Sequence, residues 1–227
     1  MKITWLGQAG LLFEDGSFSI MIDPYLSNSV VKVEPKNDRR VPVNERFLSL
    51  TPDVMIFTHD HLDHYDPETA PVFLSRKETC MTVLCPTSVW TKARQNGHHN
   101  YVQFNRHTVW TQGDYRFTSV KAVHSDPYAI GVLVEDMKKS KVYYVTGDTL
   151  YNEDIFADIP KTVDVLFLPV NGVGNNMNMA DANAFAKRIG ARTVVPFHFG
   201  MFDSLVPTGF DPENIVVPTV YQEIVIQ

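Results

Sequence analysis

The sequence predicts a layered α/β fold in which helices cover β-sheets. Short apolar or alternating runs recur along the 227 residues, many of them rich in Val, Ile, Phe and Tyr, and turn residues bound each run. Runs of this length and composition are typical of strands. Strands outnumber helices, and the later strands alternate with helices. This pattern favours sheets covered by helices over a helical bundle or a pure β-sandwich.

The elements can be placed along the chain from these runs and from their flanking residues. The expected strands are 2–6, 10–14, 19–23, 53–58, 81–86, 115–123, 129–135, 141–146, 164–170 and 193–197. The expected helices are 66–76, 86–97 and 178–190. Pro67 and Pro86 stand at the starts of the first two helices. The third helix has Asn178 as its N-cap and Gly190 as its C-cap.

The remaining chain is mostly short connections, with one exception. The segment from Ser27 to Leu50 is the longest irregular stretch, and loops of this length in a compact domain are usually functional or disordered. Whether it contacts a substrate is left open by the sequence. No internal repeat, low-complexity tract or linker interrupts the chain. We therefore expect a single domain that spans residues 1–227.

Composition and charge exclude several classes of function. Apolar residues make up 44% of the chain and charged residues 20%, a mixture that can bury a sizeable core. The net charge of −6 gives no basic footprint for a nucleic acid. No run approaches the roughly 18 consecutive apolar residues of a membrane span, and the start of the chain lacks the features of a signal peptide. Cys80 and Cys85 are expected to be buried thiols, and the protein to be cytoplasmic.

The stretch "FTHDHLDHYDP", residues 57–67, carries the strongest functional signal. It follows an apolar strand directly and supplies His59, His61, Asp63 and His64, which are the ligand types that suit a divalent transition metal. Their tight spacing suits two metals on one loop. The alternative is a solvated loop or a helix cap, and Asp66 before Pro67 suits an N-cap.

The spacing of these four residues resembles the signature of the metallo-β-lactamase superfamily, whose members are predominantly binuclear hydrolases. The resemblance implies a four-layer αββα sandwich. It also implies three further ligands, each after a strand, for which the sequence offers His124, Asp148 and His198. The implied groups are His59, His61 and His124 at one metal, and Asp63, His64 and His198 at the other, with Asp148 bridging the two.

Longer strings, including "WLGQAGLLFE", "IDPYLSNSV" and "GDTLYNEDIF", resemble the branch that contains the L-ascorbate-6-phosphate lactonases. This resemblance implies hydrolysis of a small ester, lactone or phosphate-bearing metabolite by a metal-bridging hydroxide. Asp63 would then be catalytic, because it could orient the nucleophile or carry a proton. Two ions of zinc or manganese are expected, with iron as a third candidate. A metal-dependent phosphodiesterase and a metal-dependent ligand-binding protein without turnover are the alternatives.

Candidate substrate contacts come from three further groups of side chains. Tyr25 and Tyr151 are either proton donors or packing residues. Asn176 and Asn178 bind a polar substrate, or form a turn and a helix cap. Arg39 and Arg40 bind an anionic group or lie in solvent. The expected partner is therefore a small molecule, anionic if the arginines bind it, and the oligomeric state, a homo-oligomer included, is left open. His98, His99 and His107 are expected in a solvated loop.

Overall fold

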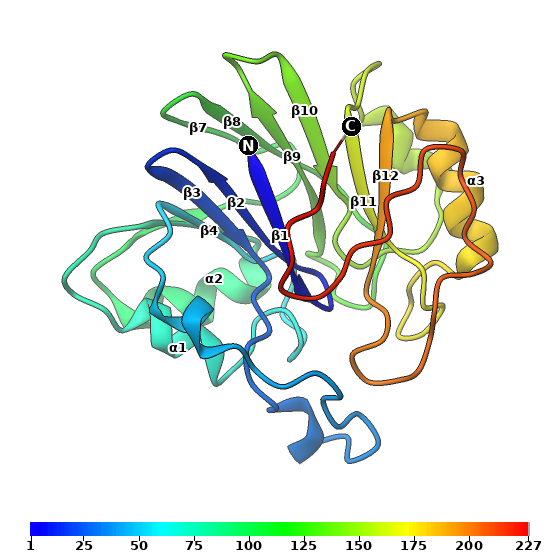
Figure 1. The fold of residues 1–227 in the computed structure, drawn as a ribbon. Helices are drawn as coiled ribbons and strands as arrows, with labels where there is room; N and C mark the ends of the chain where they lie inside the picture. The colour runs from blue at the N-terminus through cyan, green and yellow to red at the C-terminus, as the bar shows by residue number, and fades with distance from the viewer. Residues whose placement is uncertain (227) are drawn as a thin grey trace.

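The computed structural model describes residues 1–226 and contains two six-stranded sheets that pack face to face (Figure 1). The strands of the first sheet, in spatial order, are β1 (Lys2–Gly7), β2 (Gly10–Asp15), β3 (Phe18–Ile22), β4 (Val54–Ile56), β5 (Thr82–Cys85) and β6 (Asn100–Gln103). The pairs β1–β2 and β2–β3 are antiparallel, whereas β3 to β6 are parallel. Short turns can join antiparallel strands, but parallel strands need crossovers, which here carry the functional loop and two helices.

The second sheet combines antiparallel and parallel strands in the same way. Its strands, in spatial order, are β12 (Thr193–Phe197), β11 (Val165–Pro169), β10 (Lys141–Val145), β9 (Ile130–Asp136), β8 (Tyr115–Lys121) and β7 (Val109–Gln112). β7 to β10 pair antiparallel, and β10 to β12 pair parallel. The chain therefore completes one sheet before it begins the next.

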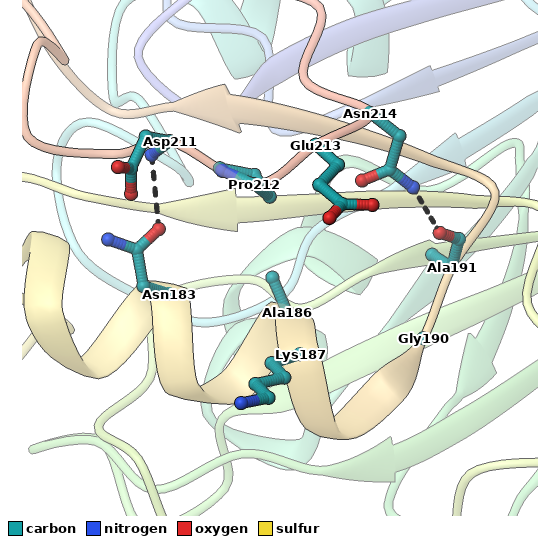
Figure 2. A pocket seen from close by; sticks show the side chains of 9 residues that line it. All are labelled: Asn183, Ala186, Lys187, Gly190, Ala191, Asp211, Pro212, Glu213 and Asn214. Atoms are coloured by element: carbon teal, nitrogen blue, oxygen red, sulfur yellow. Dashed lines mark hydrogen bonds between the residues drawn. The ribbon is translucent and has the colours of Figure 1, made fainter.

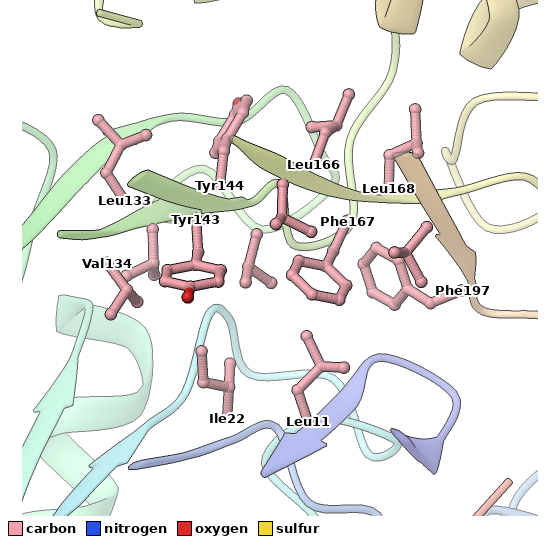
Figure 3. Close-up of a cluster of buried hydrophobic side chains, with 14 of the residues drawn as sticks. Leu11, Ile22, Leu133, Val134, Tyr143, Tyr144, Leu166, Phe167, Leu168 and Phe197 are labelled. Atoms are coloured by element: carbon pink, nitrogen blue, oxygen red, sulfur yellow. The ribbon is translucent and has the colours of Figure 1, made fainter. Parts of the chain in front are cut away.

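The core between the sheets is made by alternate side chains of facing strands. Leu11 and Ile22 of the first sheet point toward Phe167 and Phe197 of the second (Figure 3). Leu166, the neighbour of Phe167, points to the opposite face of its sheet, as the two-residue period of a strand requires. Both faces of the central strands are therefore buried.

Helices cover the two outer faces, which confirms the predicted αββα layers. α1 (Thr69–Leu74) and α2 (Thr87–Ala93) pack Phe73 and Val89 onto the outer face of the first sheet. α3 (Met179–Ile189) packs Phe185 onto the second sheet beside Tyr144. Its cap residues are the predicted ones, because the Asn178 side chain accepts from a first-turn N–H and Gly190 is left-handed.

Several local predictions were wrong. β6 and β7 lie in and beside the region expected to be a solvated loop, and His99 in this region is buried, although His98 and His107 are exposed. Cys80 is exposed rather than buried. The first predicted helix starts at Thr69 instead of 66, because the chain forms turns through the histidine-rich loop. Strands of four residues with mixed polarity give a weak pattern, so the sheet rather than the local sequence decides their structure.

The irregular segments contain four 3₁₀ helices. They are η1 (Val30–Lys32), η2 (Glu45–Ser49), η3 (Arg94–Asn96) and η4 (Glu153–Ala157). Two of them lie inside the long segment 27–50, which is therefore ordered. Within residues 1–226, no helix has the length and apolar character needed to cross a membrane.

The C-terminal segment runs along the edges of both sheets. Thr4 of β1 forms an antiparallel bridge with Glu223, and Val194 of β12 forms a parallel bridge with Ile215. Figure 1 shows this segment passing β1, an edge strand of the first sheet, and β12, an edge strand of the second. Pairing with this segment satisfies part of each exposed strand edge, which would otherwise be open to intermolecular pairing.

Candidate metal centre

The candidate ligands lie at one end of the two sheets, where several strands finish. The loop after β4 carries the histidine-rich motif, and His124, Asp148 and His198 follow β8, β10 and β12. β8, β10 and β12 run in the same direction, so their carboxyl ends all lie at the same end of the second sheet. The fold thus brings together candidate ligands that are spread over 140 positions of the sequence, from His59 to His198.

Three overlapping groups of side chains have ligand atoms within 4.8 Å of one another. The groups are His59, His61 and His124; His59, His64 and Asp148; and Asp63, His64 and His198. In the first group, His124 Nε2 lies 3.0 Å from His61 Nδ1. In the third, His198 Nε2 lies 3.2 Å from Asp63 Oδ2, and also 3.2 Å from Asp148 Oδ2. Asp148 Oδ1 lies 3.3 Å from His64 Nε2, which places Asp148 between the groups.

Buried polar atoms at this cluster lack hydrogen-bond partners within residues 1–226. They are His59 Nε2, His64 Nε2, His198 Nε2 and Asp148 Oδ1. An unsatisfied buried polar group costs about 1–3 kcal/mol, so several at one point need a common partner. A divalent cation would satisfy them, and imidazole nitrogen with carboxylate oxygen is a donor set that suits zinc, manganese or iron. The residues present therefore fit a metal site.

The charge of the cluster also favours cations. Burial alone would raise the pKa of Asp148, but His198 and His64 hold it well below its usual range. Burial would lower the pKa of His64, yet the nearby carboxylates of Asp148, Asp23 and Asp63 raise it well above its usual value. The carboxylates are thus held ionised in a buried place with positive charge beside them, and a divalent cation would supply that charge in place of a protonated imidazole.

Asp23, directly after β3, supports the cluster from behind. Its Oδ2 accepts a hydrogen bond from His64 Nδ1 at 2.8 Å, and its Oδ1 accepts from the Thr58 N–H at 2.8 Å. A ring that donates through Nδ1 has its Nε2 lone pair free for a metal. Asp23 is fully buried and has a positive φ of 42°, an unfavourable conformation that the surroundings hold. Only its place at a strand end before a proline marked it in the sequence.

Gln8, in the turn between β1 and β2, joins candidate ligands from both sheets. Its Nε2 donates to Asp63 Oδ2 at 2.9 Å, and its carbonyl oxygen accepts from the His198 N–H at 2.9 Å. The same carbonyl accepts from Trp5 Nε1 at 2.9 Å. Gln8 is buried and has a φ of 48°. Sequence reasoning missed it, because a glutamine between glycines reads as an ordinary turn.

A backbone turn and an amide side chain position Asp148. Gly147 has a φ of 61°, and a Cβ there would lie 2.7 Å from the carbonyl oxygen of Ile130, so only glycine fits. Asn176 donates from Nδ2 to Asp148 Oδ2 at 2.8 Å and accepts from the Thr149 N–H at 3.0 Å. Asn176 lines the cavity, so its predicted contact with a substrate stays a prediction. The structure adds a hydrogen bond from Asn176 to the candidate ligand Asp148.

Two other asparagines of this segment have different partners. Asn171 lies with its Nδ2 3.0 Å from His198 Nδ1 and so orients that ring. Asn178 accepts from the Asp181 N–H at 2.9 Å and caps α3. This second arrangement corresponds to the cap role that the sequence also suggested, and it places Asn178 outside the cavity lining.

The other predicted contacts lie away from the cavity wall. Tyr25 is fully buried, its hydroxyl accepts from the Val30 N–H at 3.3 Å, and burial raises its pKa to about 12. Arg39 donates to the carbonyl oxygens of Tyr25 at 2.7 Å and Val41 at 2.6 Å, and thereby holds the long segment in place. Tyr151 donates to Glu153 at 2.7 Å. Of these predicted residues, Arg40 alone is both exposed and free of a side-chain bond within residues 1–226.

The cluster opens into a cavity of about 430 Å³. His61, Asp63, Asp148 and His198 form its floor. A larger groove, about 610 Å³, lies between α3 and the C-terminal segment (Figure 2). Asn183 there accepts from the Asp211 N–H at 3.2 Å, and none of the candidate metal groups includes a residue of this groove. The smaller cavity is therefore the candidate site.

Known proteins resemble the chain over most of its length. It is 29% identical over 214 residues to a UPF0173 protein of Pyrococcus furiosus, covering 94% of this chain and 90% of that one. In an alignment of 247 positions, it is 25% identical to a UPF0173 metal-dependent hydrolase of Ruegeria sp., and the alignment covers 99% of both chains. These relatives bear a family name other than that of the ascorbate-6-phosphate lactonases.

The solved structures give the same picture of the fold. The metallo-β-lactamase fold protein YhfI of Bacillus subtilis superposes with a TM-score of 0.72 at 19% identity, covering 98% of this chain and 97% of that one. A sequence model described as the beta-lactamase superfamily domain matches residues 19–199. This range contains all the candidate metal ligands and Asp23, but not Gln8. With its paired sheets and its His/Asp cluster, the chain belongs to the metallo-β-lactamase superfamily.

Proposed function

We propose that the protein is a metal-dependent hydrolase that cleaves an ester, lactone or phosphoester bond of a small molecule. The observation that carries this proposal is a set of imidazole and carboxylate atoms without hydrogen-bond partners in residues 1–226, two of which belong to the cavity-lining residues Asp148 and His198. The relative from Ruegeria, which is named a metal-dependent hydrolase, supports the same activity. Fold alone would not, because one fold hosts many chemistries.

The candidate ligand groups would hold two cations, and Asp148, which contacts His64 and His198, would be a ligand that both could share. Bound divalent cations lower the pKa of water and polarise an acyl or phosphoryl oxygen. Asp63 is 18% exposed at the cavity floor, so its carboxylate can reach a substrate or a water as well as a metal. The Gln8 amide fixes one oxygen of Asp63, which leaves the other free to accept a proton.

The substrate within this class is the finer part of the proposal. The sequence likeness to ascorbate-6-phosphate lactonases supports a lactone, and a volume of about 430 Å³ is in the usual range for small-molecule sites. We propose a small ester or lactone first. A phosphodiester is the second candidate, because the same pair of cations can act on phosphorus.

The first test is metal content and activity together. Protein purified without chelator would be assayed for metals, beside the His61→Ala and Asp148→Ala variants. We expect about two equivalents of zinc, manganese or iron, with a clear loss in both variants. His98→Asn is the matched control, because His98 is exposed, lies outside the cluster and has a positive φ that Asn tolerates.

A panel of lactones, aryl esters and phosphodiesters then tests turnover by the metal-loaded protein. Hydrolysis that both cluster variants lose and the control keeps would support the proposal. No metal above background after reconstitution would contradict it and favour a binding protein without turnover. Retained metal with no turnover on any bond type would contradict the hydrolase activity alone.

A further inference from the structure

The cavity wall above the candidate ligands has a distinctive chemistry. Asn37, Ser125 and Asn175 supply hydrogen-bonding groups, while Val173 and Phe202 supply apolar surface. One charged side chain joins them, the carboxylate of Asp203. Within residues 1–226, the lining includes no lysine or arginine. The part of a substrate that lies beyond the metals therefore meets amides, a hydroxyl, apolar surface and a negative charge.

Three cations of the segment 27–50 have partners outside this wall, whereas Arg40 is exposed, has no side-chain bond within residues 1–226 and is not among the lining residues. In the segment 27–50, Lys32 pairs with Glu68 at 2.5 Å, and Lys36 lies 3.9 Å from Glu34. The guanidinium of Arg39 is fixed by carbonyl oxygens and by the Tyr221 hydroxyl at 2.6 Å. The fixed guanidinium of Arg39 therefore cannot turn into the cavity, and the Arg40→Gln variant described below tests the remaining cation.

Asp203 is held in a defined position rather than on a loose loop. Its Oδ1 accepts from the Gly200 N–H at 3.1 Å and from the Leu205 N–H at 2.9 Å. Neither bond uses Oδ2, which is left to accept from a ligand. Next to it, the Phe202 ring packs edge-on against Tyr25 at 5.6 Å, which stabilises this part of the wall.

We infer that the substrate's non-reacting part donates hydrogen bonds and carries no anionic group, and that Asp203 selects for it. A hydroxyl, amide or ammonium group would donate to Asp203 and to the asparagine oxygens. A carboxylate or phosphate at the same place would meet repulsion from Asp203 and find no cation in the wall. This inference rests on the proposed function, because it takes the metals as the place where the reacting group binds. It disfavours a distal phosphate, so that of the likeness to ascorbate-6-phosphate lactonases only the lactone ring, and not the phosphate, would apply to this protein.

The test uses three hydroxamates of equal chain length that end in a carboxamide, an ammonium or a carboxylate. A hydroxamate binds divalent metals directly, so its affinity can be measured calorimetrically without knowing the substrate. With the metal-loaded protein, we expect the carboxamide and ammonium compounds to bind about fivefold more tightly than the carboxylate. Metal content measured after each titration checks that the hydroxamates have not removed the cations.

Asp203→Asn is the decisive variant, because Asn can still accept the two backbone hydrogen bonds. It should weaken the ammonium compound about fivefold and strengthen the carboxylate compound, with the carboxamide little changed. Asp211→Asn, in the distant groove of Figure 2, is the matched control and should leave all three affinities unchanged. Equal thermal midpoints of the variants would show that the fold is intact.

Two outcomes would overturn the inference. One is tightest binding of the carboxylate compound, and its loss in Arg40→Gln would identify Arg40 as an anion-binding residue instead. The other is absence of binding by all three compounds to metal-loaded protein. The predicted order of affinities without hydrolysis of any ester or lactone would contradict the proposed function but support this inference.

Discussion

Gln8, in the turn between β1 and β2, forms hydrogen bonds with two residues of the candidate metal centre. Its side chain restrains Asp63 and its backbone restrains His198, although neither lies near it in the sequence. Residues that orient metal ligands are typically worth about 10–100-fold in metal affinity. We therefore expect Gln8→Ala to lose about tenfold in affinity for one of the two proposed metals, measured by competition with a chelator.

A control separates the side chain of Gln8 from its strained backbone. Gln8→Gly also removes the amide but relaxes the positive φ of 48°. If the side chain matters, both variants should lose metal affinity, and the glycine variant should be the more stable of the two. Full metal affinity in the glycine variant would show that the backbone alone positions the ligands.

At the scale of single elements, the N-terminus of α3 allows a test of whether Asn178 caps the helix or contacts a substrate. Its side chain caps the helix, so Asn178→Ala should lower the free energy of unfolding by about 1 kcal/mol. Asn178→Ser should restore most of this loss, since serine also caps. Metal content and turnover should stay as in the wild type, measured beside chemical unfolding. A raised KM with unchanged stability would instead support the substrate contact.

At the C-terminal end of η4, the largely buried carboxylate of Asp158 pairs with the exposed Arg106, and this pair gives a pH-dependent prediction. Asp158 accepts from Arg106 at 2.7 and 2.8 Å and from the Lys121 N–H at 2.8 Å. The hydrogen bonds from Arg106, then that from His107, hold the pKa of Asp158 well below its usual range, against burial. Because the folded pKa is depressed, this stabilisation is present above the unfolded pKa of about 3.9 and is lost as pH falls below it.

Asp158→Asn should therefore lower the free energy of unfolding by about 1–2 kcal/mol at neutral pH. The difference from the wild type should shrink toward pH 2, as urea unfolding at several pH values would show. Asp154→Asn is the control, because Asp154 makes an exposed pair with Lys121 that contributes little. A difference that is the same at every pH would contradict the electrostatic origin.

At the scale of the whole molecule, Tyr221 ties the C-terminal segment to the long segment 27–50. Its hydroxyl accepts from Arg39 at 2.6 Å and from the Asn44 N–H at 3.2 Å, and its ring stacks on Phe47. Tyr221→Phe should cost about 1 kcal/mol and speed proteolytic cleavage within 27–50, with metal content unchanged. Tyr101→Phe removes an exposed hydroxyl that bonds the Gly97 carbonyl, and should leave this cleavage unchanged.

Much of the fold was predictable, because it depends on local patterns. The central strands are apolar runs between turn residues, and α3 has both of its caps in the sequence. β6 and β7 were missed, since each has four residues of mixed polarity that are at least partly exposed, and their pairing with β5 and β8 decides their structure. Edge strands are set by the sheet that they join.

The sequence by itself determined which side chains could bind metal and at which strand ends they stand. It also identified Asn176 and Asn178 as candidates, but it gave both the same possible roles. Only the structure shows that Asn176 bonds to Asp148 and that Asn178 caps α3. The roles of Gln8 and Asp23 came only from the tertiary structure, as did the retention of Arg39 in the long segment. The physical reason is distance along the chain: a hydrogen bond between residues 8 and 63 depends on the packing of strands and turns. Local propensity carries no record of it.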